Sequence, residues 1–168
     1  MKKSDTSIKA RKRPDWDEYF LEMVDFVGRR GTCDRGQAGA IIVKDKRILA
    51  TGYVGSPVGL SHCDEVGHEM HTVIQENGAQ SRHCIRTAHA EQNALTQAAR
   101  IGVSVEGAAL YCGMTPCAAC AKMLINAGIE KIVCAKRYHA GEESEEMFRQ
   151  VGITLSFFDG AVQKYENQ

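Results

Sequence analysis

Two short fragments of the chain bring together residue types that bind metal ions: HAE at positions 89–91 and PCAAC at 116–120. Residues three apart share a face of a helix, so the sulfurs of Cys117 and Cys120 can reach one ion. His89 can add a neutral imidazole. Three protein ligands leave a tetrahedral zinc ion one open position for water. Such a site is catalytic, because zinc lowers the pKa of bound water from about 15.7 toward about 7.

Glu91 is the candidate proton carrier of this site. Two helical steps turn the chain by about 200°, so His89 and Glu91 cannot share a helix face. At a helix start, however, Glu91 can approach the water from another side, take its proton and return it to a leaving amine. The order HxE then PCxxC matches the zinc-deaminase signature. The alternative is a closed structural zinc site, which would need a fourth Cys or His near the CxxC.

Strands that alternate with helices have to position these residues, and such alternation implies a sheet covered on both faces. Thr115 is predicted to cap the helix that carries the cysteines, with Pro116 in its first position. The stretch Gly55–Arg86 has no clean period and is expected to be irregular. The predicted helices run from Pro14 to Gly28 and over Thr87–Arg100, Thr115–Ala127 and Glu142–Val151; the predicted strands are Ala40–Val43, Ile48–Val54, Ala108–Cys112, Ile129–Ala135 and Ile153–Phe158.

Length and charge limit the classes of protein. The 168 residues suit one domain, and no apolar run is long enough for a membrane span. The formal net charge is zero, but residues 1–13 carry six basic side chains against one acid, which predicts a disordered basic tail. The remainder is mildly acidic and aromatic residues make up only 7%, which argues against nucleic-acid binding. No secretory signal is recognisable at the start, so a cytoplasmic location is expected.

The seven cysteines favour metal binding over disulfides, since the number is odd and a cytoplasmic protein lies in a reducing compartment. Cys112 and Cys134 lie within apolar runs and are predicted to be small buried core residues. The other five lie in polar surroundings that suit metal ligands.

The chain resembles the cytidine deaminase superfamily, and within it the deoxycytidylate (dCMP) deaminases, over about residues 14–158. The matching segments are TCDRGQAGAIIVKDKRILATGY, GSPVGLSHCDE, HCIRTAHAEQNAL, TPCAACAKMLINAGIEKIV and KRYH. The TCDR and GSPVG stretches distinguish this branch. The resemblance implies a three-layer α/β/α fold with a five-stranded mixed sheet, in one zinc-dependent domain over residues 14–168. It also implies hydrolysis of dCMP to dUMP and ammonia, feeding thymidylate synthesis.

The resemblance also implies roles for single residues. His89, Cys117 and Cys120 would hold the catalytic zinc, with Glu91 as proton shuttle. The base would be held by backbone groups near Ala90 and Thr115. Tyr138 is a candidate to stack on the base, with core packing as the alternative. Arg35 is a candidate phosphate contact, with a surface ion pair as the alternative.

A second, structural zinc is known in many members of this family. Cys33, Cys63 and Cys84 are the candidate ligands here, and His68 is the predicted fourth, with His71 or His83 as alternatives. Such a site would hold the irregular stretch, which otherwise lacks a core. The alternative is that these are free cysteines in loops.

One position departs from the family. Where relatives read GYNG, this chain reads GYVG, and Val54 cannot make the side-chain hydrogen bonds associated with the dCTP effector site. Control by dCTP and dTTP is therefore expected to be altered. A homo-oligomer, commonly a hexamer, is expected from the resemblance. The alternatives left open are deamination of dCTP, CMP or cytidine, and a zinc-stabilised nucleotide-binding protein on the same scaffold.

Overall fold

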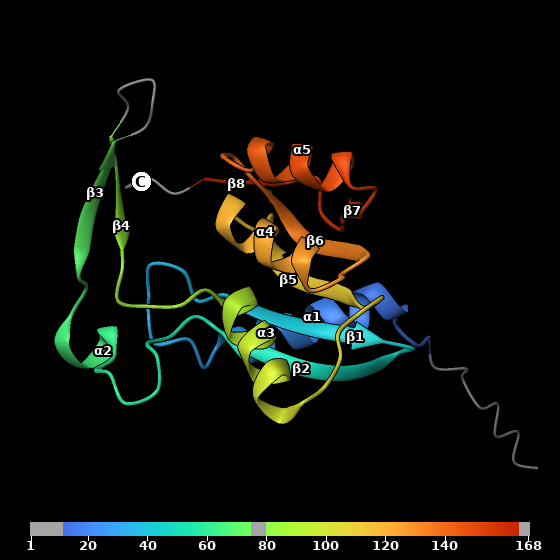
Figure 1. Ribbon diagram of the computed structural model, residues 1–168, viewed down its shortest axis with the longest axis horizontal. Helices are drawn as coiled ribbons and strands as arrows, with labels where there is room; N and C mark the ends of the chain where they lie inside the picture. The colour runs from blue at the N-terminus through green and yellow to red at the C-terminus, as the bar shows by residue number, and fades with distance from the viewer. Residues whose placement is uncertain (1–11, 75–79, 165–168) are drawn as a thin grey trace, which may run out of the picture.

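A computed structural model describes residues 12–74 and 80–164 of the chain (Figure 1). The predicted tail, residues 1–13, lies outside this part except for Lys12 and Arg13. The helices are α1 (Trp16–Gly28), α2 (Cys63–Val66), α3 (Ala90–Ile101), α4 (Ala118–Asn126) and α5 (Glu142–Gln150). The strands are β1 (Gly39–Lys44), β2 (Arg47–Tyr53), β3 (Met70–Ile74), β4 (Gln80–Cys84), β5 (Ala109–Met114), β6 (Lys131–Tyr138), β7 (Thr154–Phe157) and β8 (Val162–Gln163).

The five predicted strands form the main sheet, in the order β2-β1-β5-β6-β7. β1 runs antiparallel to both β2 and β5, whereas β5, β6 and β7 are parallel. The predicted mixed sheet is thereby confirmed. The short strand β8 pairs with the end of β6 and was not predicted. Two residues are too few to give an alternating pattern.

Helices cover both faces of this sheet, because its inner strands alternate between two apolar clusters. In β1, Ala40 and Ile42 join the core under α3 and α4, while Ile41 and Val43 face α1. Figure 1 shows α3 in front of β1 and β2, with α1 behind them. The predicted three-layer fold is confirmed.

Cys112 on β5 and Cys134 on β6 behave as predicted. They lie opposite each other in the strand register and belong to the core beneath α3 and α4. Their sulfurs are 3.6 Å apart, and both side chains are buried. Each therefore fills space as a small hydrophobic residue.

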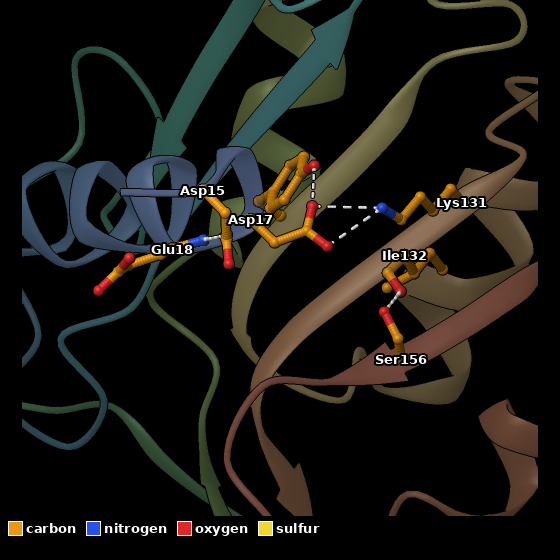
Figure 2. Close-up of polar contacts among 7 residues, drawn as sticks. Asp15, Asp17, Glu18, Lys131, Ile132 and Ser156 are labelled. Carbon is orange, nitrogen blue, oxygen red and sulfur yellow. Dashed lines mark hydrogen bonds and ion pairs between the residues drawn. The ribbon is translucent and has the colours of Figure 1, made fainter. Parts of the chain in front are cut away.

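A polar contact fixes the start of α1 against the sheet. Tyr111 on β5 donates a hydrogen bond from its hydroxyl to Asp17, at 2.6 Å, and Lys131 on β6 lies 3.2 Å from the same carboxylate oxygen (Figure 2). Tyr111 is only 5% exposed, and burial together with the Asp17 carboxylate raises the pKa of its phenol. Asp17 thus accepts a hydrogen bond from a buried hydroxyl on β5 and forms an ion pair with a lysine on β6.

The Asp17→Ala substitution should lower the free energy of unfolding by about 1–2 kcal/mol, because it leaves the buried Tyr111 hydroxyl without its acceptor. The Lys131 contact is partly exposed and adds little. Urea unfolding would measure the change. Asp25→Ala, which breaks an exposed ion pair with Arg29 on the same helix, is the control and should cost less than about 0.5 kcal/mol. Equal costs for the two variants would contradict this assignment.

The stretch 55–86 is more ordered than the sequence indicates. It contains α2 and a hairpin of β3 and β4, which projects from the body of the molecule (Figure 1). Within the described part of the chain, these two strands pair only with each other. Without a core to face, their residues carry no alternating apolar pattern, which is why the hairpin was missed.

Candidate active site

Two helix starts meet at the first predicted metal site. His89 is the N-cap of α3 and Cys117 is the N-cap of α4; both have extended backbones, with ψ of 158° and 166°. Cys120 lies in the first turn of α4. The positive ends of both helix dipoles therefore point at the site, where they favour a thiolate.

Both helices begin later than predicted. α3 starts at Ala90 instead of Thr87, because Ala88 is bridged to Gly55 in an extended conformation. α4 starts at Ala118, so the prediction of Thr115 as its cap and Pro116 as its first residue is wrong. The Thr115 hydroxyl instead accepts a hydrogen bond from the amide of Tyr138 at 3.0 Å.

The three candidate ligands have the spacing that one tetrahedral ion requires. Nδ1 of His89 lies 3.5 Å from the sulfur of Cys117 and 3.4 Å from that of Cys120. Metal–ligand bonds of about 2.1–2.3 Å at tetrahedral angles put neighbouring ligands about 3.5 Å apart. All three ligand atoms lie within 4.8 Å of one another. This donor set fits zinc.

Electrostatics also favour a metal at this position. Hydrogen bonds from Cys120 and His89 lower the pKa of the Cys117 thiol well below its usual value. The hydrogen bond to Cys117 raises the pKa of His89. This shift favours the thiolate, the form of cysteine that binds metals. Exposure decreases from His89 through Cys117 to Cys120, so the set opens to solvent on its histidine side.

Glu91 lies beside this set. Its carboxylate is 3.9 Å from the sulfur of Cys120, and the residue is 9% exposed. Burial raises the pKa of the Glu91 carboxyl. His89 and Glu91 can both reach the site because His89 precedes the helix and only Glu91 is helical. A buried carboxyl with a raised pKa is suited to accept and return a proton near neutral pH.

Two of the predicted base contacts adjoin the metal ligands in the chain: Ala90 directly follows His89, and Thr115 lies two residues before Cys117. Ala90 opens α3 and is buried, with its carbonyl oxygen against the backbone of Gly52 on β2. Tyr138 ends β6. Burial, followed by the charge of Cys117, raises the pKa of its phenol. The Tyr138 ring contacts His139 edge-on, with centroids 4.7 Å apart. Sequence reasoning did not single out His139, although it is part of the KRYH segment.

Arg35 contacts the projecting hairpin of β3 and β4. Its guanidinium donates to the carbonyl of Arg82 on β4 at 3.3 Å. It therefore joins the loop after α1 to the projecting hairpin, beside the second set of cysteines.

The second predicted set also comes together. One ligand atom from each of Cys33, Cys63, His68 and Cys84 lies within 4.8 Å of the others. Sulfur to Nδ1 is 3.7 Å for Cys33 and His68, and the sulfurs of Cys63 and Cys84 are 3.6 Å apart, far beyond the roughly 2.05 Å of a disulfide. Four ligands close a tetrahedral site, as in structural zinc centres. The alternatives His71 and His83 face each other across the hairpin, outside this set.

Two neighbours of this cysteine–histidine cage (Cys33, Cys63, His68 and Cys84) were not recognised from sequence. Asp34 lies 2.9 Å from Nε2 of His68, on the far side of the ring from Cys33. A carboxylate in that place orients a metal-binding histidine; its position next to Cys33 was the available signal. Val54 is buried against Cys33 and Cys63.

Comparison with known proteins agrees with this geometry. A family model described as the cytidine and deoxycytidylate deaminase zinc-binding region matches residues 14–136. The chain belongs to this family. It is 39% identical to the ComE operon protein 2 of Bacillus subtilis, covering 85% of this chain and 71% of that protein. It is 34% identical to the deoxycytidylate deaminase of Saccharomyces cerevisiae, covering 87% of this chain but only 46% of the yeast enzyme.

A solved structure gives the same picture. The dCMP deaminase of cyanophage S-TIM5, determined with dCMP and dUMP, is 28% identical, with a TM-score of 0.70 over 88% of this chain and 100% of that one. The predicted relationship to the dCMP deaminases is thereby confirmed. Among the described residues, no helix is both long and apolar enough to cross a membrane.

Proposed function

We propose that this protein deaminates dCMP by hydrolysis, giving dUMP and ammonia and so supplying thymidylate synthesis. The observation that carries the proposal is the buried Glu91 carboxyl beside a three-ligand set that leaves one position of an ion free. The dCMP deaminases among the relatives support the choice of substrate. Residues 14–168 would form a single zinc-dependent domain.

His89, Cys117 and Cys120 would hold zinc, which when bound supplies Lewis-acid activation of water at the pH of the cell. Glu91 takes one proton from the attacking water and delivers it to N3 of the pyrimidine as a C–O bond forms at C4. It then carries the second proton from the new C4 hydroxyl to the amine; the C4–N bond breaks, the C4 carbonyl forms, and ammonia leaves. Burial raises the pKa of the Glu91 carboxyl, which suits it to return a proton after it has taken one.

The substrate would lie between the start of α3 and the end of β6. Backbone groups near Ala90 and Thr115 hold the base, and Tyr138 stacks on it. Arg35 lies at the hairpin, so its role toward the phosphate depends on the substrate reaching that side. Comparing ammonia release from dCMP, dCTP, CMP and deoxycytidine tests the substrate. We expect the highest kcat/KM for dCMP; a higher value for any other compound would overturn the choice.

The Thr115→Val substitution should lower kcat/KM about tenfold, because the amide of Tyr138 loses its buried acceptor and the ring is no longer held. Steady-state kinetics with dCMP would measure this change. Thr115→Ser keeps the oxygen and is expected to stay within about twofold of the wild type. If valine and serine have the same effect, the hydroxyl has no positioning role.

A second, structural zinc would bind the cysteine–histidine cage. The fit of four ligand atoms supports it, as does the Asp34 carboxylate behind His68. Metal analysis of the purified protein should then give two zinc ions per chain. One ion per chain would exclude the second site.

Regulation and assembly follow from other parts of the molecule. We expect dCTP and dTTP not to act through position 54, because Val54 is buried and has no polar group. Apolar side chains exposed on the 55–86 stretch support a homo-oligomer, with a hexamer as the expected form; they are Val58, Leu60, Val66, Val73, Ile74 and Ile85. Seven free cysteines support a cytoplasmic location. Effector titration and light scattering test the first two points.

A further inference from the structure

The cysteine–histidine cage lies next to the segment that delivers the catalytic histidine. Cys84 is the last residue of β4, and only four residues separate it from His89. None of these four residues belongs to a helix or a named strand. The position of His89 therefore depends on what holds residues 85–88.

Contacts on one side tie this segment to the neighbours of His68. The amide of Ile85 donates to the carbonyl of Glu69 at 2.9 Å, and Nε of Arg86 donates to the carbonyl of Gly67 at 3.1 Å. Arg86 also pairs with Glu69. His68 lies between these two anchoring carbonyls in the sequence, so the segment and the cage are held as one unit on this side.

Contacts on the other side tie it to the neighbours of Cys33. Ala88 and Gly55 exchange two backbone hydrogen bonds, at 3.0 and 3.3 Å. Val54, next to Gly55, packs against Cys33 and Cys63, and its carbonyl accepts from the amide of Thr32 at 3.0 Å. Residue 88, which directly precedes the catalytic histidine, is thus connected to the cage through one strand end.

Little else orders this region. α2 has four residues, and β3 and β4 pair only with each other within the described residues. An isolated two-stranded hairpin is marginally stable in water. The apolar cluster here consists mainly of the cage cysteines and Val54. A metal ion that joins Cys33, Cys63, His68 and Cys84 would therefore supply most of the order.

We propose that the cage positions part of the active site. A metal ion bound by Cys33, Cys63, His68 and Cys84 holds residues 85–88 in place, and this raises the metal affinity of the site formed by His89, Cys117 and Cys120. The inference rests on the two metal sites proposed above. Coupling between two binding sites is reciprocal, so each ion must raise the affinity for the other by the same factor.

Asp34 has a defined part in this coupling, as a positioning residue. It accepts from Nε2 of His68 and so fixes the ring with Nδ1 toward Cys33. Loss of such a partner weakens metal binding about 10- to 100-fold in other proteins. The Asp34 side chain is 83% exposed, so its replacement should not disturb the fold.

The test is a cobalt titration of the metal-free full chain, followed by absorption. The cage has three thiolates and the catalytic site two, so their charge-transfer bands differ in intensity. In Cys63→Ser, we expect the dissociation constant of the His89 site to rise about tenfold or more. In His71→Ala, an exposed control outside the cage, both constants should stay within twofold of the wild type.

Asp34→Ala keeps the test decisive if Cys63→Ser fails to fold. We expect weaker cobalt binding at the cage, and weaker binding at the His89 site wherever the cage is empty, with partial rescue in Asp34→Asn. In the converse variant, Cys120→Ser, the catalytic site is expected to be empty. The cobalt affinity of the cage should then fall by the same factor by which an empty cage lowers the cobalt affinity of the His89 site. An unchanged constant at the His89 site with the cage empty would overturn the inference. These readouts are independent of dCMP turnover, so failure here leaves the proposed activity untouched.

Discussion

The Glu91→Gln variant should lose dCMP turnover by about 10³-fold or more while keeping its fold and its zinc. A general acid or base typically raises the reaction rate about 10²- to 10⁴-fold, and Glu91 is proposed to act as both. Glutamine has nearly the same size and fills the same buried space beside Cys120. It cannot, however, accept and return a proton at neutral pH.

Single-turnover assays of dUMP formation and metal analysis would be run on the same preparation. Glu143→Gln, an exposed substitution of the same kind on α5, serves as the control and should retain wild-type turnover. If Glu91→Gln kept more than a tenth of the wild-type rate, Glu91 would not be the proton carrier. If it lost zinc together with activity, the carboxylate would have to be regarded as a part of the metal site.

Gly52→Ala should destabilise the protein by about 3 kcal/mol and disturb the active site as well, since overpacking a rigid contact is costly. A Cβ at Gly52 would overlap the carbonyl oxygen of Ala90 and the amide nitrogen of Ala94, both in the backbone of α3. The helix can relieve this overlap only by moving away from β2. His89 and Glu91, at the start of α3, would move with it.

Urea unfolding and zinc content would measure the two effects of Gly52→Ala. Gly113→Ala is a matched control, since Gly113 also lies in a strand but a Cβ there meets no atom within 4 Å. It should leave the free energy of unfolding unchanged or raise it by up to about 1 kcal/mol. Equal stability of the two variants would show that α3 is not held by close contact with β2.

The local sequence was enough to predict what depends on short-range pattern. The alternation of strands with helices predicted a sheet covered on both faces, and the HxE and CxxC spacings predicted that His89, Glu91, Cys117 and Cys120 lie together. The helix starts were misplaced, because threonine is a preferred N-cap residue and both Thr87 and Thr115 precede alanine-rich stretches. Tertiary contacts, the Gly55–Ala88 bridge and the Thr115–Tyr138 hydrogen bond, engage this part of the chain before each helix begins.

The second site shows why the rest was harder to predict. Its four residues are spread over 33–84, and the choice of His68 over His71 or His83 depends on how the hairpin turns. The apolar residues of the hairpin show no regular spacing that would predict this turn, because the hairpin faces no core. The Asp34 carboxylate behind His68 likewise follows only from the folded arrangement.

The most direct measurement is the reaction itself, run in water enriched in oxygen-18 with the zinc-loaded full chain and dCMP. We predict one dUMP and one ammonia for each dCMP consumed, with a single heavy oxygen at C4 of the uracil ring. A protein that holds zinc at His89, Cys117 and Cys120 yet forms no dUMP would contradict the proposed function.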